Sequence, residues 1–237
     1  DLIVTPKVRW TWCGPTSVAN SLWWLDSAKE LGLRPPPELD DGSELVQSYN
    51  PTVWDDHDPR NVPPFIEDLA WQMDTDGAQT GLKHFGTTVW DMQAGIAHYL
   101  SKTGLNPQGD VNGDGVVDNA DMAIVMAAIG SHPGDPNWNL AADLNADQIV
   151  DFKDLTIVTA NLGKKGKFYE RTVWGKSLTF DLIERELYLC EDVVLLLGFW
   201  QYNPVTEQWT RFGGHYVTVA GVDSKDMYIA ISDPFLN

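Results

Sequence analysis

The chain has 237 residues, of which 43% are hydrophobic, so it is long and apolar enough to fold around a sizeable core. Its formal net charge of -18 argues against nucleic acid and anionic membrane surfaces as partners. The longest apolar run, Val193–Trp200, is far shorter than the roughly 20 residues of a membrane-spanning helix, which predicts no membrane span.

The first predicted helix begins at Cys13 and continues to Gly32. Pro15 suits its first turn, and apolar residues then recur at helical spacing. A thiol at a helix N-terminus lies at the positive end of the helix dipole, which favours the nucleophilic thiolate. The alternatives are a buried structural cysteine and a disulfide with Cys190, the other cysteine of the chain.

Helices are predicted in the first hundred residues and strands toward the C-terminus. Apolar residues at helical spacing predict further helices over 64–72, 88–101 and 178–189. Apolar runs and alternation predict strands over 193–202, 206–212, 215–222 and 227–232. The first of these strands is continuously apolar, which is typical of a buried strand. Helices followed by antiparallel strands indicate the α+β class.

Residues 110–163 form a compositionally distinct region with an internal repeat. They include nine Asp but no Glu or Arg, and Lys153 is their single lysine. An Asp- and Asn-rich loop beginning at Asp110 is followed by an apolar segment, and the same pattern begins again at Asp143. Repeats of this kind indicate a structural unit of their own.

Each loop places oxygen ligands at positions 1, 3, 5, 9 and 12, with a backbone carbonyl at position 7. This is the donor pattern that a hard cation such as calcium requires. We therefore predict two calcium ions, one in each loop. The ligands of the first loop are Asp110, Asn112, Asp114, Val116, Asp118 and Asp121. Those of the second are Asp143, Asn145, Asp147, Ile149, Asp151 and Asp154.

The two loops depart from the EF-hand pattern, because position 12 is Asp instead of Glu and no helix precedes either loop. In both respects the stretch resembles the paired loop–helix units of dockerin modules. The resemblance implies a cohesin-like partner, bound through the residues before the last ligand and along the following helix. Those positions hold Asn119-Ala120 and Phe152-Lys153, not the hydroxyl pair of cellulosome dockerins, so a purely structural calcium module is an equal alternative.

His215 is the histidine best placed to partner Cys13. It follows Gly213-Gly214 and opens a predicted strand, whereas the other four histidines lie in loops or in the helical half. Asp233 comes 18 residues later, at the end of the next strand. Because that separation is one hairpin long, an antiparallel pair would bring Asp233 beside His215.

These motifs resemble a papain-like cysteine peptidase, most closely the bacteriocin-processing type and its secreted relatives. Cys13 and His215 are 202 residues apart. Without the 54 residues of the repeat region the separation is 148, within the roughly 130–150 of that arrangement. The resemblance implies a papain-like two-lobe fold with a helical lobe over 1–108, a small all-α, EF-hand-like and dockerin-like insertion over 109–163, and an antiparallel β lobe over 164–237.

The papain-like resemblance also implies a reaction on a peptide or protein substrate. His215 would take the Cys13 proton, the thiolate would attack an acyl carbon, and Asp233 would orient the imidazole. The Cys13 backbone N–H would help to hold the oxyanion. The family's second oxyanion donor is a glutamine about six residues before the cysteine, and here that position is Lys7.

Three functions therefore remain open. The first is an extracellular cysteine peptidase with a calcium-stabilised insertion. The second is an inactive peptidase-like protein used in self-assembly at the cell surface or in a filament, and the third is a calcium-dependent module that binds a cohesin-like partner. Calcium loops suit the calcium-rich extracellular space. The chain begins at Asp1 without a secretory signal, so a processed N-terminus is expected.

Overall fold

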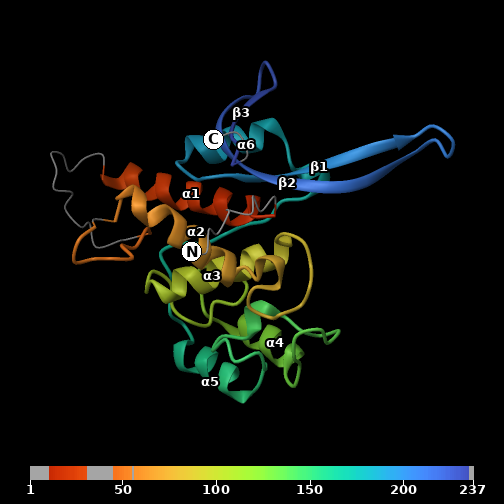
Figure 1. The fold of residues 1–237 in the computed structure, drawn as a ribbon. Coiled ribbons are helices and arrows are strands. Elements are labelled where there is room, and N and C mark those ends of the chain that lie inside the picture. Colours follow the sequence, from red (N-terminus) through yellow and green to blue (C-terminus); the bar gives the residue numbers. More distant parts are fainter. Residues whose placement is uncertain (1–10, 31–44, 55, 235–237) are drawn as a thin grey trace, which may run out of the picture.

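The computed structural model describes residues 11–30, 45–54 and 56–234 (Figure 1). Lys7 lies outside these residues. The α-helices are α1 (Cys13–Glu30), α2 (Val62–Gln72), α3 (Val89–Lys102), α4 (Asn119–Ala128), α5 (Phe152–Asn161) and α6 (Phe180–Tyr188). Short 3-10 turns are η1 (Pro59–Asn61), η2 (Thr75–Gly77), η3 (Leu140–Ala142) and η4 (Gly175–Ser177). The strands are β1 (Val194–Asn203), β2 (Gln208–Asp223) and β3 (Tyr228–Ser232).

Helices α1, α2 and α3 pack around the largest apolar core of the described residues. Phe65 of α2 and Tyr99 of α3 are fully buried there, and their rings are 5.5 Å apart. The Tyr99 hydroxyl donates to the Leu45 carbonyl at 2.6 Å, so the phenol is satisfied inside the core. Gly95 allows α3 to approach the end of α2, since a Cβ there would lie 2.3 Å from Met73 Cγ.

Local capping sets where the predicted helices begin. The Thr88 hydroxyl accepts from the Asp91 N–H at 3.1 Å and begins α3, and Thr179 caps α6 in the same way through the Leu182 N–H. Both helices, together with α1 and α2, overlap the helices predicted from apolar spacing. The sequence prediction of these elements is confirmed, with boundaries that differ by only one or two residues.

The strands form one antiparallel sheet in the order β1-β2-β3. The sequence pattern predicted separate strands before and after Gly213-Gly214, and this was wrong: β2 runs through both glycines. Opposite them, Gly198 and Phe199 of β1 keep the pairing continuous. Because a paired neighbour holds these glycines extended, they do not end the strand.

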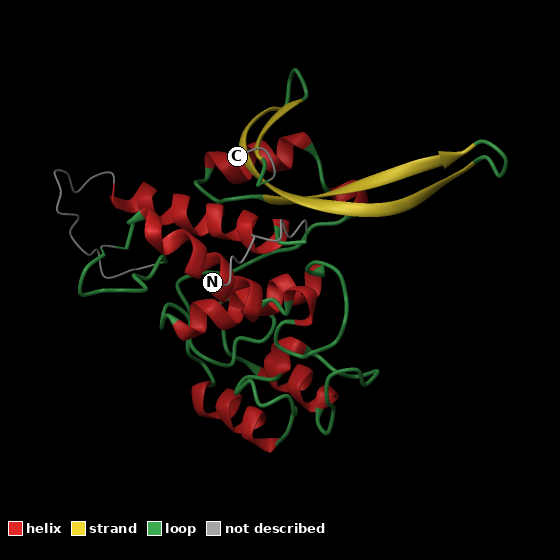
Figure 2. Cartoon of the chain, viewed as in Figure 1, coloured by secondary structure: helices red, strands yellow, loops and turns green. Residues whose placement is uncertain are grey.

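The outer halves of β1 and β2 project from the body as a two-stranded ribbon (Figure 2). The prediction that residues 193–202 form a buried strand was therefore wrong for most of its length. Only the first residues of β1 lie over the helices, and the remainder is exposed. The exposed large aromatic side chains of the ribbon are Phe199, Trp200, Tyr202, Trp209 and Phe212. An apolar run in the sequence does not by itself show whether other parts of the fold cover that strand.

The base of the sheet lies between α1 on one face and α6 on the other (Figure 1). On the α1 face, Tyr216 joins the helical core, and Thr218 Oγ1 donates to the Ser17 carbonyl at 2.8 Å. On the α6 face, Val217 packs with Ile183 in a smaller apolar cluster. The two parts of the chain that flank the repeat region thus share one folded body.

The repeat region folds as a separate helical layer beneath α3. Its core includes Val125 of α4 and Val158 of α5, together with Ala94 of α3. The chain enters and leaves this layer side by side, because Asn106 Nδ2 donates to the Phe168 carbonyl at 2.9 Å. This is the geometry expected of an insertion whose ends lie close together.

The mixture of helices with an antiparallel sheet agrees with the predicted α+β class. Within 11–30, 45–54 and 56–234, no helix combines the length and apolar character needed to cross a bilayer.

The helical core generates a stability prediction. Truncating the buried ring in Phe65→Ala leaves a cavity and should lower the free energy of unfolding by about 3–5 kcal/mol. The control is Phe85→Ala, because the Phe85 side chain is 97% exposed and its loss should change stability by no more than about 0.5 kcal/mol. Urea denaturation of both variants measures the difference, and equal losses would contradict the assigned core.

Candidate functional site

The first predicted calcium loop surrounds a buried carboxylate. Asp110 is only 6% exposed, and its Oδ2 accepts from the Gly115 N–H at 2.9 Å. Its Oδ1 is buried and has no hydrogen-bond partner among the described residues. An unsatisfied buried carboxylate oxygen is costly, and a bound cation would remove that cost. The residues of the loop therefore fit a calcium ion.

The aspartate at position 12 closes each loop. Asp121 is fully buried, and its two oxygens accept from the N–H groups of Val111 at 2.7 Å and Asp118 at 2.8 Å. Asp154 makes the equivalent bonds in the second loop. The bonds from the Asp118 and Asp151 N–H groups are also part of the capping boxes that begin α4 and α5. The short Asp side chain thus joins the last ligand position to the start of the helix.

Asparagine side chains help to shape both predicted loops. Side-chain oxygens of Asn112 and Asn145 accept from backbone N–H groups two residues on, which curls both loops inward. Oxygen atoms alone from carboxylates, amides and a backbone carbonyl are the donor set that calcium prefers over softer metals. Calcium bound there would neutralise the carboxylates and fix the loops, while Asp110 and Asp143 would supply the first ligand of each.

The loop carboxylates perturb one another electrostatically. Burial, and secondarily the nearby carboxylates, raise the pKa of Asp110 to about 6, and the same causes raise that of Asp143 to about 6. Lys153 is the cation nearest the second loop and holds Asp147 Oδ2 at 2.8 Å. The first loop has Ala120 at the position equivalent to Lys153.

Sequence reasoning missed one carboxyl group that lies beside the first loop. Glu170 follows the repeat region, and its N–H donates to the Gly113 carbonyl at 2.8 Å. Burial, together with the Asp110 carboxylate, raises the pKa of Glu170 to about 8. No sequence pattern links Glu170 to the first loop, because their contact depends on the path that the chain takes as it leaves the repeat region.

The second set of predicted site residues lies where α1 meets the sheet. Cys13 is half-buried at the first residue of α1. His215 Nε2 lies 2.7 Å from Asp233 Oδ1, and both side chains are 18% exposed. Since Nε2 faces the carboxylate, Nδ1 is the nitrogen that remains to exchange a proton with a thiol.

Cys13 and His215 have different neighbours in the structure. Cys13 packs against the core that contains Tyr216, and burial, with the nearby Cys13 second, raises the pKa of Tyr216 to about 12. His215, the preceding residue, shares the opposite face with Val217. Across the described residues, no hydrogen bond joins the Cys13 thiol to His215. The structure thus pairs the histidine with its carboxylate but not with the cysteine.

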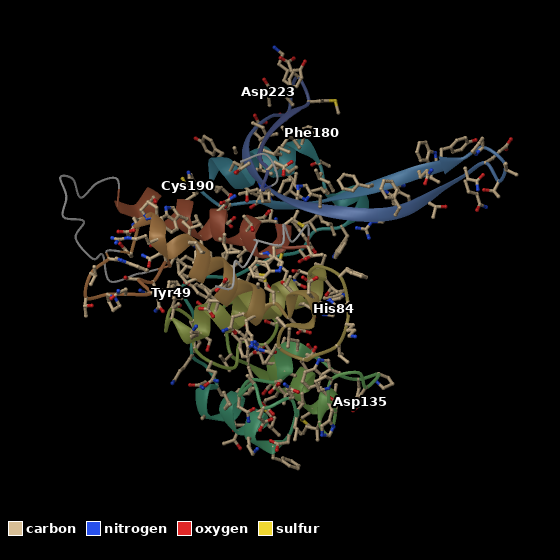
Figure 3. All side chains as sticks on the ribbon, viewed as in Figure 1. Tyr49, His84, Asp135, Phe180, Cys190 and Asp223 are labelled. Atoms are coloured by element: carbon tan, nitrogen blue, oxygen red, sulfur yellow. The ribbon has the colours of Figure 1, made fainter. Side chains whose placement is uncertain are left out.

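Cys13 and Cys190 are both free thiols, so the alternative of a disulfide between them is not observed. Cys190 is exposed just after α6 (Figure 3).

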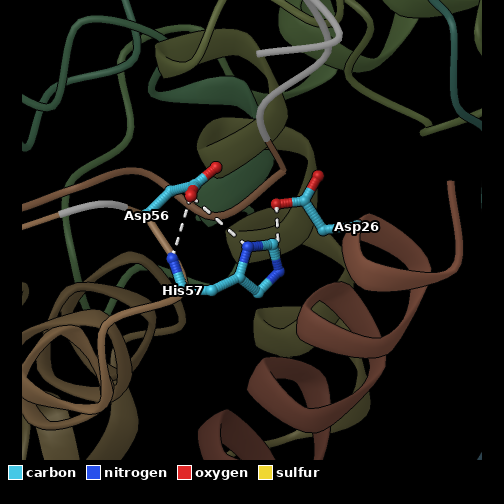
Figure 4. A group of neighbouring side chains, drawn as sticks. All are labelled: Asp26, Asp56 and His57. Carbon is cyan, nitrogen blue, oxygen red and sulfur yellow. Dashed lines mark hydrogen bonds and ion pairs between the residues drawn. The ribbon is translucent and has the colours of Figure 1, made fainter. Parts of the chain in front are cut away.

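A further polar cluster, missed in the sequence, joins Asp26 of α1 to Asp56 and His57 (Figure 4). The buried Asp26 accepts from the backbone N–H groups of Leu45 and Val46, both at 3.1 Å. His57 Nε2 lies 2.9 Å from the Ser27 hydroxyl. Because these bonds already engage the Asp26 oxygens, the cluster ties α1 to the following segments and has a structural role.

The raised pKa values of Asp110 and Asp143 predict opposite pH dependences with and without calcium. Calcium needs both carboxylates ionised, so its affinity should fall as the pH drops below about 6. Without calcium, the folded pKa exceeds the unfolded value of about 3.9, so stability should instead rise as the pH falls from about 6 to about 4.

Calorimetric calcium titrations and thermal melts in chelator across this pH range measure the two effects. Asp135→Asn is a matched control, because Asp135 lies in the same layer but outside both loops. A calcium affinity that does not change with pH would contradict the assignment of the two carboxylates as ligands.

Comparison with known proteins identifies one part of the chain. Residues 108–163 match the family described as Dockerin type I domain. No curated protein and no solved structure matches the chain, so the papain-like resemblance of the flanking residues has no support from these comparisons. The match covers both calcium loops together with α4 and α5. Residues 108–163 are therefore a dockerin type I domain carried within a longer chain.

Proposed function

We propose that residues 108–163 bind two calcium ions and dock the chain onto a cohesin-like partner. The family match over both loop–helix units is the observation that carries this proposal. Dockerin domains are typically components of extracellular or cell-surface proteins, which favours a location outside the cytoplasm. A calcium supply there would keep the loops occupied.

The start of α5 offers a docking surface of suitable chemistry. Phe152 is 72% exposed, and Lys153 follows it at the position where dockerins contact their partners. A large exposed aromatic next to a cation is typical of residues that contribute strongly to binding. The equivalent residues of α4, Asn119 and Ala120, are smaller, so α5 would dominate the contact.

Calcium would act on docking by ordering the loops that begin both helices. Asp118 and Asp151 are at once ligand positions and N-caps of α4 and α5. Fixing the loops would therefore fix the orientation of Phe152. A purely structural calcium domain remains the alternative, in which the loops are ordered but no partner binds α5.

Binding to purified cohesin domains tests the docking proposal. We expect binding that is lost in chelator and in the Asp110→Ala/Asp143→Ala double variant, because the helix starts depend on the loops. Phe152→Ala should weaken binding on the order of tenfold while leaving calcium affinity unchanged. Phe85→Ala, an exposed aromatic outside the domain, is the matched control. Calcium binding without capture of any cohesin would leave only the structural role.

A thiol-dependent hydrolase is the second candidate function, and the 2.7 Å pair of His215 and Asp233 favours it. Asp233 would hold the imidazole in place, and Nδ1 would take the proton from Cys13. The thiolate would attack the acyl carbon of a peptide or amide, and the imidazolium would return the proton to the leaving amine. A papain-like two-lobe arrangement of residues 1–108 and 164–237 belongs to this proposal.

The lack of a hydrogen bond between Cys13 and His215 in the described part of the chain bears directly on activity. The thiol and imidazole would have to approach each other for proton transfer, and Lys7 would have to serve as the second oxyanion donor. If either requirement fails, the protein would be an inactive peptidase-like protein that serves in assembly. Reactivity of the thiol distinguishes these functions.

Alkylation by iodoacetamide, followed by mass spectrometry at each cysteine, tests the second candidate. Cys13 should react at least about tenfold faster than the exposed Cys190 at neutral pH, because His215 would stabilise its thiolate. His215→Ala should remove this advantage without changing the rate at Cys190. Cys13 reacting no faster than Cys190 would exclude an activated nucleophile.

A further inference from the structure

The first calcium loop is covered by the segment that leaves the dockerin domain. Gly166 N–H donates to the Gly115 carbonyl, and Glu170 N–H donates to the Gly113 carbonyl, both at 2.8 Å. Val116, the position 7 residue, also pairs with Lys165 in an isolated antiparallel bridge. Residues that follow the calcium-loop pattern in the sequence are thus hydrogen-bonded to the backbone of this loop.

The Glu170 side chain lies directly over the same loop. A Cβ added to Gly113 would be 2.7 Å from Glu170 Cγ and 2.8 Å from its Oε1, so the glycine leaves room for the carboxyl group. Among the described residues, no donor forms a hydrogen bond with the Glu170 carboxyl group and no cation forms an ion pair with it. The Asp110 carboxylate acts on Glu170 electrostatically, and the buried Oδ1 of Asp110 has no hydrogen-bond partner among the described residues. Two neighbouring carboxyl groups can be satisfied by a proton or by a bound cation, and a cation would allow both to ionise.

The second loop differs from the first in ways that weaken a cation site. Lys153 holds the ligand Asp147 at 2.8 Å and would compete with calcium for that carboxylate. Ala146 and Gln148 occupy left-handed backbone conformations, with φ of 56° and 66°, at positions where the first loop has Gly113 and Gly115. The first loop therefore has more negative charge and less backbone strain.

We propose that Glu170 adds a carboxylate to the first calcium site and makes it the tighter of the two. Calcium accepts six to eight oxygens at flexible geometry, so a donor from outside the loop can join the site or its hydration shell. This inference deepens the calcium-dependent function proposed above and rests on it. Calcium in the first loop then also fastens the dockerin domain to the segment that leads into α6 and the sheet.

Calcium titration of the full chain in single-site backgrounds tests this assignment. Asp143→Ala leaves the first loop as the intact site, and Asp110→Ala leaves the second. Glu170→Gln, which keeps the size of the side chain, should weaken calcium binding on the order of tenfold in the Asp143→Ala background and leave it unchanged in the Asp110→Ala background. Glu207→Gln removes a distant charge from the turn between β1 and β2 and is the matched control.

The outcomes separate the inference from the function on which it rests. An unchanged calcium affinity of the first loop in Glu170→Gln would overturn the role of Glu170 while leaving calcium-dependent docking intact. Tighter binding by the second loop than by the first would equally overturn it. A chain that binds no calcium in either background would instead refute the proposed function itself. Thermal melts with calcium should show that Glu170→Gln lowers the calcium-induced stabilisation of the Asp143→Ala chain.

Discussion

Buried negative charge in the two loops is the constraint on which the dockerin domain depends. Asp110 and Asp143 are buried beside other carboxylates, which raises the pKa of each to about 6. The carboxylate oxygens of Asp121 and Asp154 accept hydrogen bonds from backbone N–H groups and help to begin the helices. Since carboxylates at the predicted ligand positions also cap the helices, cation binding would be coupled to helix orientation. Under the proposed function, a partner that contacts the helices would therefore respond to calcium.

The remainder of the molecule depends on a different interaction, the packing of α1 between the helical core and β2. Thr218 donates to the Ser17 carbonyl, and Asn20 Nδ2 lies 3.3 Å from the Ser232 hydroxyl. These contacts join segments about two hundred residues apart into one body. They also fix how the N-terminus of α1, with Cys13, meets the strand that holds His215. The dockerin domain can be inserted without breaking this body because Asn106 fastens the two connecting segments together.

Local patterns predicted the dockerin domain well, and non-local features poorly. The ligand spacing after Asp110 and Asp143 is a short-range signal, since each loop closes on itself within twelve residues. The same is true of Thr88, whose hydroxyl caps a helix through a residue three positions later. The ribbon of β1 and β2 was misread because its apolar residues are exposed, and exposure depends on what else the fold places nearby.

By itself, the sequence determined the dockerin-like repeat, the approximate helix positions and the α+β class, because these follow from spacing and periodicity over a few residues. The hairpin spacing also predicted that Asp233 lies beside His215, which the structure shows. Only the tertiary structure decided that Cys13 packs against the core that contains Tyr216. It also decided that Glu170 covers the first loop. These contacts depend on strand register and on the path of the connecting segments, which are set by packing between distant parts of the chain.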